Sequence, residues 1–153
     1  MHRQRRTTAI LIRPPRVPAY HHKLLETAGA MKGSEPEIAV ILAQMACEIA
    51  CELAFTAVIA QKEVSGLQTT VDVLLPNYNL GSDNPRVRKA YVALSGDRIT
   101  SQPYWDDFKA HVRRRNRIVH GGARATPEEA EKSVTVASSL VAHLEQILEA
   151  ARA

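Results

Sequence analysis

Residues 38–60 read IAVILAQMACEIACELAFTAVIA, and this run decides the fold. It is apolar almost all the way round a helix, which is typical of a helix buried in the middle of a domain. The preceding Ser34-Glu35-Pro36-Glu37 has the sequence of a capping box, so we expect the helix to start there and to end near Val64. A membrane span of this length would hold two carboxylates at its centre, which is costly in lipid, so we expect no membrane insertion.

One polar line interrupts this helix, formed by Gln44, Glu48, Glu52 and Thr56 at intervals of four residues. No lysine or arginine occurs between residues 38 and 61, so the acids have no partner within their own helix. The line is either a solvated strip, or at least one acid pairs with a base from another helix, because a buried carboxylate needs a partner.

The two cysteines, Cys47 and Cys51, lie one turn apart on one face of the same helix. They cannot close a useful disulfide loop, and free cysteine commonly serves as a small buried hydrophobe. No partners stand at zinc-ligand spacing from them, so we predict neither a metal nor a cofactor. Reduced, buried thiols favour a cytoplasmic location.

The remaining helical segments are marked by capping and breaking residues. We expect shorter helices over residues 19–31, 67–75 and 84–96, and a longer one from about Pro103 to His120. Thr126-Pro127-Glu128-Glu129 is a second capping box, and it opens a final helix with one apolar face suited to antiparallel packing. That face consists of Ala130, Val134, Ala137, Val141, Leu144, Leu148 and Ala151.

The sequence therefore predicts one all-α domain over residues 17–153. Its expected architecture is an antiparallel helical bundle with one long central helix and a long C-terminal helix. Residues 1–16 are rich in arginine and proline, and they form either a basic arm for RNA or an unstructured tail. The formal net charge is +4, with basic residues concentrated near the start and over residues 109–117, which favours a polyanionic partner.

The helix before His120 carries the candidate chemistry. Its apolar stripe of Trp105, Phe108 and Val112 continues into Arg115 or Asn116, so a guanidinium should point inward and should need an acceptor. Glu48 and Glu52 are the expected supporting acids. The other basic residues are expected to be solvated and to bind RNA: Lys109, Arg113, Arg114, Arg117 and Arg124.

His120 follows Asn116 by one helical turn and is followed by Gly121-Gly122. Histidine titrates near neutral pH and can act as an acid or a base at a phosphodiester, while an arginine offsets the charge that builds on the phosphate. A simpler interpretation is that His120 only caps the carbonyls at the end of its helix.

Arg115-Asn116, three further residues and His120 resemble the R-N-x-x-x-H form of the HEPN family motif. The surroundings are similar too, with Trp105 and Phe108 before the motif and Thr126 opening the helix after it. The resemblance covers residues 34–151 in helical layout and is specific in sequence only over residues 105–130.

The resemblance implies helical domains that pair as homodimers, with two motifs facing one cleft. It implies a metal-independent endoribonuclease in which His120 assists attack by the ribose 2′-hydroxyl on the adjacent phosphate, leaving a 2′,3′-cyclic phosphate. Arg115 would stabilise that phosphate and Asn116 would orient the site. A toxin branch of the family has a tyrosine two residues after the histidine, which an antitoxin partner modifies with AMP. Gly122 stands there, so this kind of antitoxin is not supported, although another antitoxin protein remains possible.

Three functions stay open on the sequence. The first is a homodimeric HEPN ribonuclease of the toxin or phage-defence kind. The second is a non-catalytic relative that binds RNA or nucleotides or serves in dimerisation. The third is a helical interaction protein whose arginines form a solvated face. The presence of all three motif residues favours the first over the second, and an inward-pointing Arg115 weighs against the third.

Overall fold

A computed structural model describes residues 19–153, so the basic segment 1–16 lies outside the described residues. The described chain is all-helical and contains no strand. Its helices are α1 (Tyr20–Met31), α2 (Pro36–Gln61), α3 (Leu67–Leu74), α4 (Arg86–Ser95), α5 (Trp105–Gly121) and α6 (Pro127–Arg152), with a short 3-10 helix at Ile99–Ser101. The all-α prediction and the expected order of helices are confirmed.

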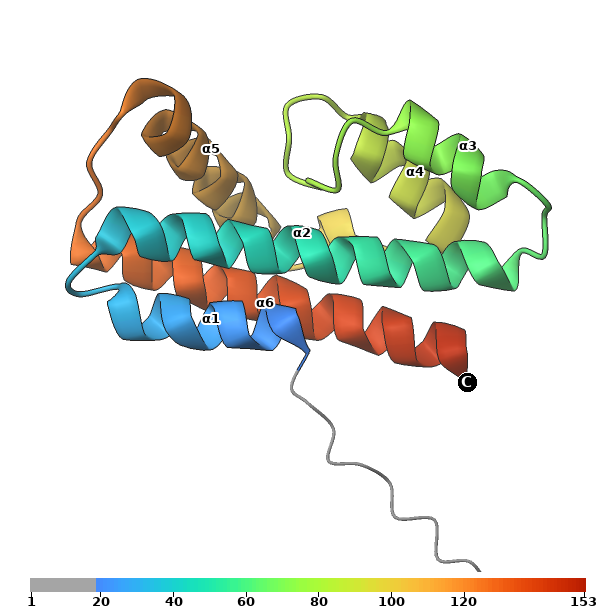
Figure 1. Ribbon diagram of the computed structural model, residues 1–153, viewed down its shortest axis with the longest axis horizontal. Coiled ribbons are helices and arrows are strands. Elements are labelled where there is room, and N and C mark those ends of the chain that lie inside the picture. The colour runs from blue at the N-terminus through green and yellow to red at the C-terminus, as the bar shows by residue number, and fades with distance from the viewer. Residues whose placement is uncertain (1–18) are drawn as a thin grey trace, which may run out of the picture.

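The two longest helices, α2 and α6, run parallel to each other (Figure 1). The backbone N–H of Ala125 donates to Glu37 across 88 residues of chain, and the Cys47 thiol lies 3.9 Å from the carbonyl oxygen of Ala137 across 90 residues. The two pairs of contacting residues are separated by nearly the same number of residues along the chain, so α2 and α6 run in the same direction. The prediction that the last helix packs antiparallel to its neighbours is therefore wrong for its contact with α2. The segment between α2 and α6 crosses back over the molecule, so both helices start at the same end.

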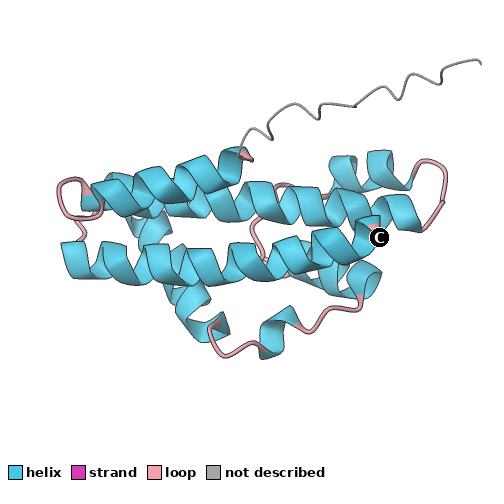
Figure 2. Ribbon diagram, turned by 90° about the horizontal axis from the view of Figure 1, so that it is seen from below, coloured by secondary structure: helices cyan, strands magenta, loops and turns pink. Residues whose placement is uncertain are grey.

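Helix α1 is antiparallel to both long helices. A short turn joins it to α2, and it meets α6 with its direction reversed: His21 contacts Glu145, whereas Lys32 pairs with Glu131 near the start of α6. The antiparallel prediction thus holds for α1. The three helices form one layer, which Figure 2 shows from below.

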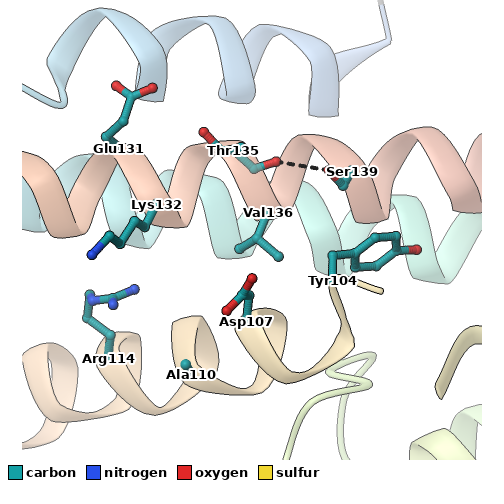
Figure 3. Close-up of a pocket in the computed structure, with 9 residues that line it drawn as sticks. All are labelled: Tyr104, Asp107, Ala110, Arg114, Glu131, Lys132, Thr135, Val136 and Ser139. Carbon is teal, nitrogen blue, oxygen red and sulfur yellow. Dashed lines mark hydrogen bonds between the residues drawn. The ribbon is translucent and has the colours of Figure 1, made fainter. Parts of the chain in front are cut away.

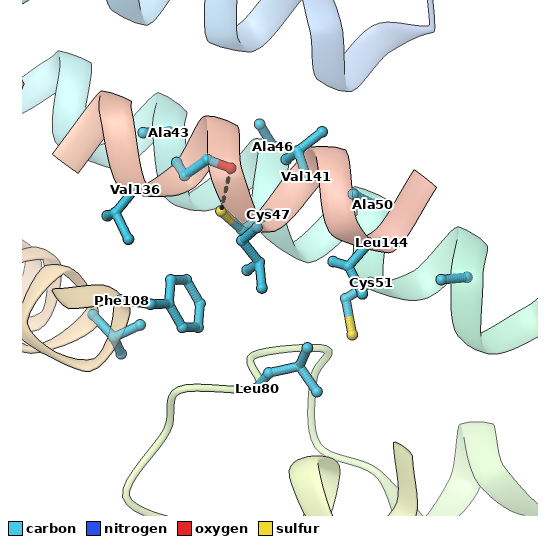
Figure 4. Close-up of a cluster of buried hydrophobic side chains, with 14 of the residues drawn as sticks. Ala43, Ala46, Cys47, Ala50, Cys51, Leu80, Phe108, Val136, Val141 and Leu144 are labelled. Carbon is cyan, nitrogen blue, oxygen red and sulfur yellow. Dashed lines mark hydrogen bonds between the residues drawn. The ribbon is translucent and has the colours of Figure 1, made fainter. Parts of the chain in front are cut away.

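Small residues on α2 allow α1 and α6 to approach closely. Buried alanines recur along it at intervals of three or four residues. On α6, the small residues Ala130, Ser133 and Ala137 are fully buried. Larger side chains such as Phe108 and Leu144 fill the space around this contact, and Cys47 and Cys51 lie within it (Figure 4). Burial raises the pKa of both thiols, so they remain protonated core groups. The buried alanines of α2 are Ala39, Ala43, Ala46, Ala50 and Ala54.

Helices α3, α4 and α5 form the second layer over α2 (Figure 1). The loop between α3 and α4 presses its backbone against α5: a Cβ added at Gly81 would lie 2.7 Å from Val112 and 2.8 Å from Phe108. On the other side, Asp97 accepts hydrogen bonds from the Tyr91 hydroxyl and from the His143 ring, each at 2.8 Å. These contacts fix the start of α5 against the first layer.

By length and composition, α2 could also cross a membrane, a test that the core helix of a soluble protein passes as well. In the structure α2 packs against each of the other five α-helices of the described chain, most extensively against α1 and α6. This packing is what we expect of a central core helix.

Candidate active site

The motif lies on the last two turns of α5, and the chain leaves the helix directly after it. Gly122 has a left-handed φ of 63°, and its N–H donates to the carbonyl of Ile118 at 3.0 Å. Ala123 donates to the carbonyl of Arg117 at 3.2 Å, which completes the helix end. The carbonyls of Arg117 and Ile118 therefore receive backbone donors, and the exposed His120 is not needed to cap these two.

Arg115 and Asn116 are in direct contact. Nη1 of Arg115 donates to Oδ1 of Asn116 at 3.1 Å, and both side chains are half-buried. The Nε of Arg115 is fully buried and has no hydrogen-bond partner among residues 19–153. A guanidinium donor that is buried but unpaired is energetically costly, so this group has unused capacity for an anionic acceptor.

The expected acids do not supply that acceptor. Glu48 accepts a hydrogen bond from the fully buried Gln44 at 2.8 Å, and Glu52 is exposed. Both line a shallow depression of about 270 Å³ together with Asn77 and Tyr78 of the α3–α4 loop. The prediction that they pair with Arg115 is wrong, because this line of α2 turns towards that loop and not towards α5.

Arg114 differs from the expected solvated residue. Its Nη1 donates to the buried hydroxyl of Ser133 at 2.7 Å, and its Nε lies 3.8 Å from Glu129, with only 15% of its side chain exposed. Glu129 also accepts from the N–H of Thr126 in the capping box, which is confirmed at the start of α6. Arg114 therefore joins α5 to α6. Only the small exposed part of its guanidinium is therefore available for the predicted contact with RNA.

His111 is fully buried one turn before Arg115, and sequence reasoning missed it. Its ring lies 6.0 Å from that of Phe108, and neither of its nitrogens has a partner within the described chain. Burial, reinforced by the nearby positive charges of Arg114 and Arg115, lowers the pKa of His111 to about 3. The ring is therefore neutral. The available signal was its spacing, three residues after Phe108 on the core-facing side.

The remaining predicted RNA-binding residues lie on the outer face of α5 or just beyond it. Arg113 and Arg117 are exposed one turn apart, and the next turn brings His120 onto the same side. Lys109, one turn earlier, is half-buried and pairs with Asp106 at 2.9 Å. Arg124 is 92% exposed, and its Nε lies 3.3 Å from Glu37.

Glu37 holds the segment that follows His120. The expected capping box at Ser34 does not form, since Glu35 is the N-cap of α2 and no side chain caps it. Glu37 instead accepts the N–H of Ala125 at 3.0 Å. That backbone hydrogen bond, with help from Arg124, lowers the pKa of Glu37. The start of α2 is thereby tied to the turn between α5 and α6, next to the motif.

A groove of about 400 Å³ lies between α5 and α6, on the side that Arg114 faces (Figure 3). Its charged residues are of both signs, with Arg114 and Lys132 at one end and Asp107 nearer Tyr104. Desolvation raises the pKa of Tyr104 to about 12, so its hydroxyl stays protonated. The mixed charge makes this groove less suited to a polyanion than the outer face of α5.

Comparison with known protein families, with curated protein sequences and with solved structures finds no match for this chain.

Proposed function

We propose that the chain is a metal-independent endoribonuclease of the HEPN type that acts as a homodimer. The observation that carries this proposal is the state of Arg115: it is held by Asn116, buried at Nε, and left without an anionic partner in the described chain. A structural arginine in this position would have an acid beside it. An arginine reserved for a phosphate would not.

The neighbouring residues suit the same chemistry. His120 is exposed, lies one turn beyond Asn116, and is followed by two glycines that leave its ring uncrowded. A histidine in that position can take the proton of a ribose 2′-hydroxyl as the oxygen attacks the adjacent phosphorus. The 5′-oxygen then leaves and takes a proton from the imidazolium or from water, so the products are a 2′,3′-cyclic phosphate and a 5′-hydroxyl. Arg115 stabilises the charge on the phosphate during this step.

A homodimer fits the exposed apolar residues of α2. Ile38 is 42% exposed and Met45 is 41% exposed, with the half-buried Ile41 and Ile49 on the same side of the helix. The start of α2 lies beside the turn that follows His120, because Glu37 binds that turn. Val119, next to His120, is also 45% exposed. Pairing through α2 would bring two motifs towards a shared cleft.

The decisive experiment incubates purified protein with end-labelled RNA in the presence of EDTA. We expect cleavage with 2′,3′-cyclic phosphate ends, and a loss of at least about 100-fold in His120→Ala, as is usual when a general base is removed. Arg115→Ala should lose a comparable factor. His22→Ala is the control for His120, since both histidines are exposed, and Arg88→Ala is the control for Arg115, since Arg88 is a half-buried arginine on α4.

Equal cleavage by His120→Ala and by the wild type would contradict the proposal. So would activity that EDTA abolishes, or products with a 3′-hydroxyl. RNA binding without any cleavage would favour the non-catalytic HEPN-like module instead.

A further inference from the structure

Three side chains with metal-binding atoms meet where the start of α1 contacts α6. They are His21 and His22, in the first turn of α1, and Glu145 of α6. Their ligand atoms all lie within 4.8 Å of one another. Nε2 of His21 is 2.8 Å from Oε1 of Glu145, and Nε2 of His22 contacts the same oxygen. The two rings lie with their centroids 4.5 Å apart.

Two ring nitrogens, one from each histidine, converge on a single carboxylate oxygen, so the three side chains place their ligand atoms in one small volume. His21 is 2% exposed, and its Nδ1 is buried without a partner among the described residues. A cation placed among these atoms would take one donor atom from each of the three side chains.

We propose that His21, His22 and Glu145 form a binding site for a divalent transition-metal ion of the zinc class. Two imidazole nitrogens with one carboxylate oxygen are a ligand set that zinc uses, and three protein ligands leave a further position for water. Mg²⁺ and Ca²⁺ prefer sites built from oxygen atoms, so they should bind weakly here. Among first-row divalent transition-metal ions, we expect affinity for this site to increase with the ion's general affinity for nitrogen ligands.

The site would act on stability and not on RNA cleavage. It joins α1 to α6 at the end of α1 that lies away from the α1–α2 turn, whereas the turn after His120 lies close to that α1–α2 turn (Figure 1). Sequence reasoning had no means of finding it, since 124 residues separate His21 from Glu145. This proposal does not rest on the proposed ribonuclease function.

The test uses the full chain without a histidine tag, stripped with EDTA and dialysed. Zn²⁺ should bind with a stoichiometry of one per chain by calorimetry, and saturating Zn²⁺ should raise Tm by about 5 °C. Co²⁺ should give a visible absorption band, whereas Mg²⁺ should produce neither effect. His22→Gln and Glu145→Gln should weaken Zn²⁺ binding by at least about tenfold, in line with the loss of a ligand.

Glu149→Gln is the matched control, because Glu149 is an exposed acid one turn further along α6. It should bind Zn²⁺ as the wild type does, and so should His120→Ala. His22→Gln should keep its RNA cleavage if the chain is a ribonuclease, so the two proposals fail separately. A wild type that binds no Zn²⁺, or binding that survives in both His22→Gln and Glu145→Gln, would overturn the metal site.

Discussion

Arg114 and Arg115 are neighbours in the sequence but differ in what they bind. Arg114 turns towards α6, where Ser133 accepts its hydrogen bond and Glu129 lies close by. Arg115 donates only to Asn116 and pairs with no acid of the described chain, although the Nε of each arginine is buried without a hydrogen bond there. At the scale of one residue, the first arginine positions α5 and the second is available for a ligand.

His111 should make stability depend on pH. Its pKa is about 3 in the folded chain and 6.5 when unperturbed, so below pH 6.5 the unfolded chain gains a proton that the folded chain does not. Stability therefore falls as the pH falls from about 6.5 towards 3, by about 1.4 kcal/mol per pH unit. We expect His111→Leu to remove this loss. The free energy of unfolding in urea, taken as variant minus wild type, should be about 2 kcal/mol larger at pH 5 than at pH 7, which means that the variant is relatively more stable at pH 5. Parallel pH curves for the two proteins would contradict the buried neutral ring.

A side chain at Gly122 should destabilise the protein, whereas a side chain at the neighbouring Gly121 should not. Its φ of 63° costs an L-residue about 1–2 kcal/mol, although the space around it is open. Gly121 is helical and equally uncrowded, so alanine there should be neutral or stabilising. We expect thermal unfolding to show a lower Tm for Gly122→Ala only. Similar shifts in both variants would mean that the helix does not end where the structure places it.

At the scale of the helices, the parallel contact of α2 with α6 depends on small side chains. Ala137 is fully buried against α2, so Ala137→Leu would force the two helices apart or strain the core. Overpacking of this kind costs about 1–3 kcal/mol. Ala142→Leu is the control, because Ala142 is exposed on the same helix. Denaturant unfolding should separate the two variants, and equal stabilities would argue against close packing at Ala137.

At the scale of the whole molecule, the exposed apolar side of α2 bears on dimer formation. Met45→Glu should convert the proposed homodimer to a monomer and reduce RNA cleavage with it, since a buried unpaired charge opposes association. Val73→Glu is the control, because Val73 is an apolar residue that is 79% exposed on a different helix, α3. Light scattering after size exclusion measures the mass of each variant. A dimer that survives Met45→Glu would place the interface elsewhere.

The sequence was a good guide wherever local chemistry decides the outcome. Thr126 caps α6, Gly96 and Gly122 end their helices, and the apolar run of α2 lies at the centre. It failed where a partner comes from far along the chain. Glu37 resembles a capping residue but binds Ala125, and Arg114 resembles a solvated charge but binds Ser133. No local pattern carries such pairings, because they depend on how the helices pack in space.

The parallel arrangement of α2 and α6 has a consequence for synthesis on the ribosome. About 65 residues separate the end of α2 from the start of α6, so α2 is complete well before the helix that covers its main face has been made. During that interval the most apolar helix of the chain has α1, and then α3 to α5 as they are made, but it lacks α6, with which it packs most extensively. Exposed apolar surface of this kind makes a nascent chain prone to aggregation. Conditions that stall translation between Gln61 and Pro127 should therefore increase the aggregation of this protein more than a substitution on its folded surface does.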